Sequence, residues 1–285
     1  MNQSKKKRDF HMCKTNNCYK TCINDKYKLS ERILTHSKEI VSDLKIKSNI
    51  GRPGIEFERG LSGIFYLLKT GIQWNALPRC FGSYSAVHRL FQMLRIARFF
   101  EKLWHRELQE YDKIQGLNLS VQAADCAHIK SPLGQEKTGK SPVDRKKLGT
   151  KRSIIVEKTG IVIGYALGSG NRHDSTLFEA SVRSIPLFLI QPLSKEMHLD
   201  SAYDSKQIRV ILFNYYYVPK ISKNNRNSKT KVTQKTEKKR WIVESTHSWI
   251  NRFRRLLVRF EKLASNYLAL MHFSFSIITS NRLDI

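Results

Sequence analysis

The stretch HLDSAYDS, residues 198–205, places two aspartates four positions apart, each flanked by apolar or small residues. Residues 196–200 are predicted to form a strand that ends at Asp200, and residues 205–214 a helix that follows it. An aspartate directly after a strand is most often the N-cap of the next helix. Asp200 and Asp204 therefore indicate no function until other carboxylates are found to join them.

The rest of the chain predicts the elements around this strand. The expected strands are 119–125, 152–157, 161–167, 196–200 and 215–221, and the expected helices of this part are 174–184, 205–214 and 240–260. Residues 158–160 between two strands suit a hairpin turn. A three-stranded meander followed by strands that alternate with helices is the element order of a ribonuclease-H-like mixed sheet. The predicted fold class is therefore α/β.

Three carboxylates would meet in such a fold. Asp125 is expected at the end of the first strand, Asp200 at the end of the fourth, and Glu244 early in the last helix. Strands one and four would be neighbours in the sheet, with the last helix beside them. Such a group of acids repels itself unless a cation is present, and hard divalent ions bind carboxylate oxygen. Two such ions suit phosphoryl displacement on nucleic acid.

The net charge favours a polyanionic partner. The chain has 285 residues with 51 Lys and Arg against 24 Asp and Glu, a formal charge of +27. Nucleic acid is the usual partner of such a protein, although a lysine-rich proteome would also produce basic chains. The sequence contains no run of 18 apolar residues, so no membrane span is predicted. The basic N-terminus lacks the apolar segment of a secretory signal. We expect a cytoplasmic protein.

The N-terminal part is predicted to be helical and basic. Residues 1–48 are polar and lysine-rich, with one helix near 31–44, and helices are expected at 55–69 and within 83–108. A helix, a turn and a basic helix suggest a helix-turn-helix, although any small bundle gives the same pattern. Ser83 or Ser85 could cap the second helix. Arg89 and Arg95 are its candidate DNA contacts.

The cysteines near the N-terminus do not predict a metal site. Cys13, Cys18 and Cys22 cluster with His11, but the spacing is loose and no second pair completes a zinc site. Free thiols are the expected state.

The last predicted helix has two faces. The apolar stripe comprises Ile242, Trp249, Phe253, Leu256 and Phe260. The opposite face is expected to carry Arg240, Glu244, His247, Asn251, and Arg254 or Arg255. Taken alone, Glu244 could equally be the partner of Arg240 in an exposed ion pair.

Five blocks of this sequence resemble a known family in the same order. RWIVESTHSWINRFRRLLVRFEK (240–262) closely resembles the C-terminal signature of bacterial insertion-sequence transposases, in the insertion-sequence-five-like branch of the insertion-sequence-four superfamily. QAADCAHIKS, SGNRHDS and HLDSAYDS resemble its other blocks, and residues 52–91 resemble its N-terminal helical region. The resemblance covers about residues 50 to 280.

The resemblance implies a DDE catalytic core with a ribonuclease-H-like fold. By position, Asp125, Asp200 and Glu244 would be the catalytic and metal-binding triad, with two ions of Mg²⁺ or Mn²⁺, while Asp204 would cap the following helix. The implied organisation is a basic arm (1–48), a helical DNA-binding region (49–115) and a catalytic domain (116–285).

One family signature is matched only in part. Of the pattern Tyr-x2-Arg-x3-Glu-x6-Lys, Arg240 and Glu244 are present, but Glu237 stands in place of the tyrosine and Asn251 in place of the lysine. Both positions would contact the transposon end. Arg254 and Arg255 are candidate substitutes for phosphate contact.

The implied function is that of a DNA transposase. It would cleave double-stranded DNA at terminal inverted repeats and join the ends to target DNA, as a homodimer in the synaptic complex, at the bacterial nucleoid. Two alternatives stay open: a catalytically inactive, transposase-derived DNA-binding protein, and a metal-dependent nuclease without strand transfer.

Overall fold

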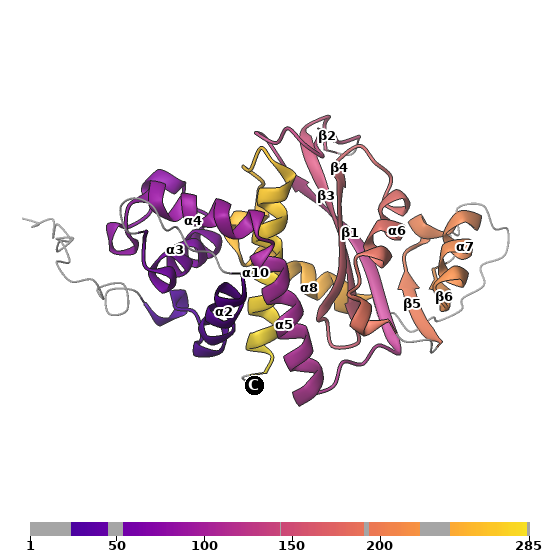
Figure 1. Ribbon diagram of the computed structural model, residues 1–285. Helices are drawn as coiled ribbons and strands as arrows, with labels where there is room; N and C mark the ends of the chain where they lie inside the picture. Colours follow the sequence, from indigo (N-terminus) through magenta and orange to yellow (C-terminus); the bar gives the residue numbers. More distant parts are fainter. Residues whose placement is uncertain (1–23, 45–53, 143, 191–193, 223–239, 284–285) are drawn as a thin grey trace, which may run out of the picture.

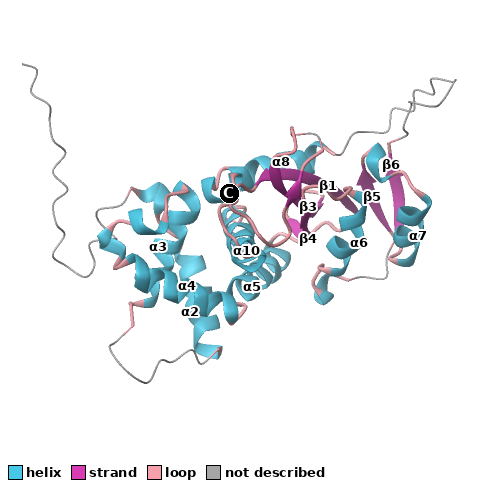
Figure 2. Cartoon of the chain, turned by 90° about the horizontal axis from the view of Figure 1, so that it is seen from above, coloured by secondary structure: helices cyan, strands magenta, loops and turns pink. Residues whose placement is uncertain are grey.

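The computed structural model describes residues 24–44, 54–142, 144–190, 194–222 and 240–283. Helices cover both faces of a mixed sheet, and a cluster of N-terminal helices lies to one side (Figures 1 and 2). Two of the predictions above lie outside the described residues: the cysteine cluster near the N-terminus and the assignment of Glu237.

Four helices form most of the N-terminal part. They are α2 (Glu31–Asp43), α3 (Phe57–Thr70), α4 (Tyr84–Ile96) and α5 (Phe99–Ile114). Ser83 caps α4 by accepting a hydrogen bond from the amide of Ala86, which decides between the two serines considered above. The stretch 83–108 is two helices because Arg98, at φ 54°, breaks the helical path between them.

Six strands form one mixed sheet. They are β1 (Val121–Lys130), β2 (Gly139–Lys140), β3 (Leu148–Glu157), β4 (Val162–Ser169), β5 (Lys195–Leu199) and β6 (Tyr217–Ile221). β1, β3 and β4 form an antiparallel meander, and β5 and β6 continue the sheet parallel to β1. Gly160, at φ 92°, makes the predicted hairpin turn. The predicted ribonuclease-H-like α/β order is confirmed.

Two strands are longer than predicted. β1 pairs with β3 as far as Lys130, so Asp125 lies in the middle of its strand and not at the end. β3 begins at Leu148, four residues before the predicted start at residue 152, and β2 lies in a segment where no strand was predicted. Most of these additional residues are polar, glycine or not fully buried, so they form no apolar run that would mark a strand.

Helices cover both faces of the sheet. α6 (Ser175–Arg183) and α7 (Lys206–Asn214) lie on one side, and α8 (Trp241–Asn251), α9 (Arg254–Leu257) and α10 (Ala264–Asn281) on the other (Figure 1). The helix predicted over 240–260 therefore ends at Asn251. Its continuation instead pairs with the sheet: Val258 forms a parallel bridge to Lys130, whose carbonyl accepts the amide of Arg259 at 2.8 Å.

α10 was not predicted, and it lies at the centre of the molecule. It packs against α5 and lies between the N-terminal helices and the sheet (Figures 1 and 2). Trp104 of α5 is fully buried there, donates its indole N–H to the Val162 carbonyl at 3.3 Å, and stacks on His272 of α10. One continuous core therefore includes both parts of the chain. No helix in the described ranges is long and apolar enough to cross a membrane.

Replacing Trp104 should destabilise the whole chain. Trp104→Ala removes a fully buried indole that contacts α5, α10 and β4, so we expect a loss of about 3–5 kcal/mol in the free energy of unfolding. Urea unfolding measures it. Ile96→Ala, at a side chain 72% exposed, is the control and should change little. Comparable losses from both variants would contradict this role of Trp104.

Candidate functional site

The register of two parallel strands brings Asp125 and Asp200 together. β1 and β5 pair Val121 with Glu196 and Ala123 with His198. Continuing this register by two residues brings Asp200, which is still in extended conformation at the end of β5, level with Asp125. Asp200 also accepts the amide of Ser201 at 2.7 Å. The sheet itself therefore sets these two carboxylates side by side.

Arg240 joins the third carboxylate to this pair. Its Nη1 lies 3.0 Å from Asp200 Oδ1, and its Nη2 lies 3.4 Å from Oε1 of Glu244, in the first turn of α8. The side chains of Asp200 and Glu244 are 41% and 59% exposed. The Arg240–Glu244 ion pair considered above is therefore present, but it is shared with Asp200.

Asp125 is the most enclosed of the three acids. Burial raises its pKa to about 6; the nearby charges of Asp174 and Asp200 also raise it, while a backbone hydrogen bond at Cys126 and the charge of Arg240 lower it. A carboxyl group with this pKa is only partly protonated near neutral pH. Its negative charge there would be stabilised by a cation.

Asp174 is a fourth carboxylate that the sequence analysis treated only as a helix start. It occupies the N-cap position of α6 without a side-chain capping bond, and its Oδ1 lies 2.6 Å from Nζ of Lys151. Its effect on the pKa of Asp125 shows that it lies near that residue. The block SGNRHDS carried the signal, because it contains an acid between two blocks that each supply one.

The donor chemistry of this group fits a divalent ion. Asp125, Asp200 and Glu244 offer hard oxygen ligands, and burial, with smaller contributions from the charges of Asp174 and Asp200, makes the ionised form of Asp125 unfavourable without added positive charge. Within the described ranges, however, no three His, Cys, Asp or Glu side chains are arranged to hold a metal ion. Arg240 provides the positive charge between Asp200 and Glu244.

A buried polar group lies beneath α8. Arg152 of β3 is fully buried, and its Nη2 donates to Nδ1 of His247 at 3.2 Å and to Oδ1 of Asn251 at 3.0 Å. Burial, together with the charge of Arg152, lowers the pKa of His247 to about 3. His247 is therefore neutral and interior. It lies on the predicted stripe with Glu244, but this part of the stripe faces the interior.

The residues predicted to contact DNA differ in their surroundings. Arg254 and Arg89 are exposed. Arg95 is half-buried and binds Gln92 and Ser265, and Asn251 accepts from Arg152.

Arg255 is not on the surface, which corrects its predicted placement. It is buried, with Nε 2.6 Å from Glu261 and Nη1 donating to the Ile72 carbonyl at 3.0 Å. α8 ends at Asn251, and Arg255 lies in the separate short helix α9, where its side chain is buried.

Asp204 does not cap the helix that follows it, contrary to the expectation above. Ser205 is the N-cap and accepts the amide of Ile208, while Asp204 pairs with Arg209 at 2.7 Å. Asp204 therefore lies outside the group of carboxylates to which Asp200 belongs, because its ion pair is with Arg209.

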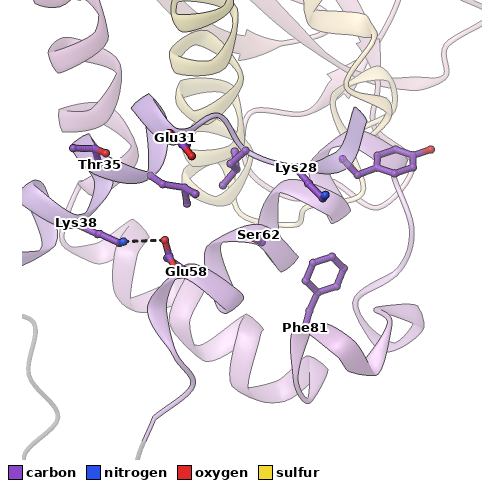
Figure 3. A pocket seen from close by; sticks show the side chains of 10 residues that line it. Lys28, Glu31, Thr35, Lys38, Glu58, Ser62 and Phe81 are labelled. Atoms are coloured by element: carbon purple, nitrogen blue, oxygen red, sulfur yellow. Dashed lines mark ion pairs between the residues drawn. The ribbon is translucent and has the colours of Figure 1, made fainter. Parts of the chain in front are cut away.

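A cavity of about 440 Å³ lies elsewhere, among the N-terminal helices (Figure 3). Its walls come from α2, α3 and the turns beside them, and an ion pair of 2.9 Å joins Lys38 to Glu58 across it. It lies on the opposite side of α5 and α10 from the sheet (Figure 1). No residue of the predicted site lines it.

Comparisons with known proteins decide the family. Residues 119–277 match the family model "Transposase DDE domain", and residues 35–104 match "Putative transposase of IS4/5 family". The chain belongs to the DDE transposase family. It is also 32% identical over 155 residues, which are 53% of this chain and 72% of the relative, to the "Putative transposase for insertion sequence element IS402" of Burkholderia cepacia. The predicted transposase identity is confirmed, and membership of this family implies dependence on a divalent metal.

Solved structures show weaker similarity. The Mos1 strand transfer complex is 10% identical, with 90% of this chain and 85% of that chain covered and a TM-score of 0.33. The catalytic domain of Mos1 mariner transposase is 12% identical, with coverage of 64% and 91% and a TM-score of 0.26. These scores are low, so the family assignment rests on the sequence matches.

The environment of Asp125 predicts a pH-dependent stability difference. An acid whose pKa is higher in the folded state than in the unfolded state favours folding only while protonated, so the wild type loses stability as the pH rises from about 4 to above 6. In Asp125→Asn the side chain at this position does not titrate, so this loss of stability is absent. Without divalent ions, the variant should be more stable by about 1–3 kcal/mol near pH 8, and the difference should vanish near pH 4.

Urea unfolding of both proteins in a chelating buffer, across this pH range, measures the difference. A stability difference that stays constant with pH would show that the carboxyl group of Asp125 titrates alike in the folded and unfolded chain.

Proposed function

We propose that this transposase cleaves the ends of its insertion sequence and joins them to target DNA, with Asp125, Asp200 and Glu244 as its metal-binding and catalytic carboxylates. The observation that carries the proposal is the placement of acids from three elements: the register of β1 and β5 sets Asp125 level with Asp200, and Arg240 contacts both Asp200 and Glu244 of α8. In a chain of the DDE transposase family, such a group suits phosphoryl transfer.

The three carboxylates are held by different elements. Asp125 is fixed in mid-strand and Asp200 at a strand end, so the sheet sets their spacing, while Glu244 extends from the exposed start of a helix. Bound Mg²⁺ or Mn²⁺, as two ions, would activate the attacking oxygen and stabilise the leaving one. Arg240 has to release the carboxylates, and its guanidinium then becomes available to a DNA phosphate.

DNA contact is proposed for two surfaces. α3, the turn after it and α4 form a helix-turn-helix-like unit that presents Arg89 and is suited to terminal inverted repeats. Arg254, whose backbone lies against Gly71 at the end of α3, is an exposed cation suited to backbone phosphate. The side chains of Arg95 and Asn251 can reach DNA only by giving up the internal bonds described above.

The chemistry requires two DNA ends in one complex, so we propose a homodimer as the working state. The division into an arm (1–48), a DNA-binding region (49–115) and a catalytic domain (116–285) remains part of this proposal, with α10 shared between the last two. All three carboxylates are present in the sequence, so nothing favours the inactive DNA-binding protein. A nuclease without strand transfer differs only in its products.

The carboxylates can be tested in one assay of cleavage and strand transfer. With Mg²⁺ and duplex DNA that carries the ends flanking this gene, the wild type should give cut and joined products. Asp125→Ala, Asp200→Ala and Glu244→Gln should each lower the rate at least about 100-fold while binding the ends, because each removes a metal ligand. Electrophoresis of labelled ends measures both steps.

Asp204→Asn is the matched control, because it removes an acid four residues from Asp200 that pairs with Arg209 instead. It should leave the rate within about threefold of the wild type. Cut but unjoined wild-type products would favour the nuclease. Full activity in the Glu244→Gln variant would remove Glu244 from the site.

Replacement of Arg254 should affect DNA binding, whereas replacement of the adjacent Arg255 should affect stability. Arg254→Ala loses an exposed cation, so the slope of log affinity against log salt should fall by about one with little change in stability. Arg255→Ala leaves Glu261 buried and unpaired, so the free energy of unfolding should fall by about 3–5 kcal/mol. Binding titrations in several salt concentrations and urea unfolding measure the two effects. The reverse pattern would return Arg255 to the DNA surface.

A further inference from the structure

Two buried side chains of α8 lie in line with Glu244. His247 and Asn251 follow Glu244 by three and seven positions, so the three residues lie along one stripe of the helix. Glu244 is exposed at the start of this stripe, whereas His247 is buried and Asn251 half-buried. Contacts that hold His247 and Asn251 therefore also set the position of the helix turn that carries Glu244.

Arg152 of β3 holds both of them. Its Nη2 donates to His247 at 3.2 Å and to Asn251 at 3.0 Å. The guanidinium is fully buried, its Nε and Nη1 form no hydrogen bond of ordinary geometry, and within the described ranges no carboxylate forms an ion pair with it. The hydroxyl of Tyr267 is the other polar group beside it. An uncompensated buried charge is costly to maintain, so a reason for its presence is needed.

Arg152 also lies on the same face of the sheet as Asp125. The register pairs Asp125 with Ile154 and Ala127 with Arg152, and side chains alternate along a strand. Asp125 and Arg152 therefore both extend toward the face that α8 covers. The buried guanidinium of Arg152 lies between β1, which carries Asp125, and α8, which carries Glu244.

His247 completes the connection to β1. Because an arginine can only donate, Nδ1 of His247 accepts its bond and Nε2 carries the proton. This N–H is enclosed and has no hydrogen-bond partner, while the main chain at Asp125 lies near enough to the ring to raise its pKa slightly. The imidazole therefore bonds to β3 through Arg152 and lies beside β1 at Asp125.

We propose that Arg152, His247 and Asn251 are positioning residues that set the placement of Glu244 relative to Asp125, and thereby the affinity of the site for its divalent ions. The inference rests on the proposed role of those two carboxylates. Outer residues that orient metal ligands commonly change metal affinity by about 10- to 100-fold when they are replaced. None of the three touches DNA or the reacting atoms here, so none is a catalytic residue.

Thr246 supplies a matched control from the same helix. It is fully buried, and its hydroxyl donates to the Gly160 carbonyl at 2.8 Å, which ties α8 to the turn between β3 and β4. It is adjacent to His247 but has no bond to Arg152 or to Asp125. Thr246→Val therefore loses a buried tether of α8 without touching the proposed positioning group.

The experiment measures Mn²⁺ affinity of the full chain bound to a duplex carrying the element end, by electron paramagnetic resonance. His247→Leu should weaken Mn²⁺ binding at least about 10-fold, and Asn251→Ala should weaken it in the same direction. His247→Gln should recover most of the loss, because its amide can both accept from Arg152 and donate. Thr246→Val should leave Mn²⁺ affinity within about twofold of the wild type.

Urea unfolding without metal separates folding from positioning. Equal losses of Mn²⁺ affinity in His247→Leu and Thr246→Val, or none in His247→Leu, would overturn the inference. If His247→Leu does not fold, the half-buried Asn251→Ala variant decides the same question. Glu244→Gln tests the proposed function separately: unchanged Mn²⁺ affinity in that variant would remove Glu244 as a ligand, whatever the His247 variants show.

Discussion

The parallel pairing of β1 with β5 is the constraint on which the site depends. Backbone hydrogen bonds fix the register, and the register sets Asp125 level with Asp200. Attraction between the side chains contributes nothing to this arrangement, because two carboxylates repel each other and one of them is largely buried. The sheet therefore holds an unfavourable pair of charges in place, which is the condition under which a site binds a cation tightly. Burial of Asp125 raises its pKa, and the charge of Asp200 adds to this effect.

The positive charge at the site comes from the start of α8. Arg240 contacts Asp200 and Glu244 together, so the helix that carries the third carboxylate also carries its counter-charge. Arg240 and Glu244 are one helical turn apart, and the pair is exposed enough that it adds little stability. An interaction this weak can be exchanged for phosphate and metal ions without unfolding the helix. The buried contacts of α8 can hold the helix in place while this exchange occurs.

Much of the sheet and the three carboxylates could be predicted from the sequence, because apolar runs mark buried strands and acids after them stand out. The prediction stopped β1 near Asp125 because the apolar run ends at Ala124, whereas hydrogen bonding continues to Lys130 through half-buried residues. The end of α8 was missed because no Gly or Pro marks it, and contacts with Lys130 outweigh local helix propensity. α10 is buried on almost every side, so it has no polar face from which helical periodicity could be recognised.

α10 also connects the N-terminal helices to the sheet. Arg95 of α4 donates to Ser265 at the start of α10, and Trp104 of α5 stacks on His272 further along the same helix. The N-terminal helices are therefore attached to the sheet through a buried element and not through a flexible linker alone. Interiors packed at this density deform little, so α4 and the carboxylates keep a fixed separation. A DNA end bound along α4 would then meet the carboxylates at a position set by the fold, and transposition would need little movement within one subunit.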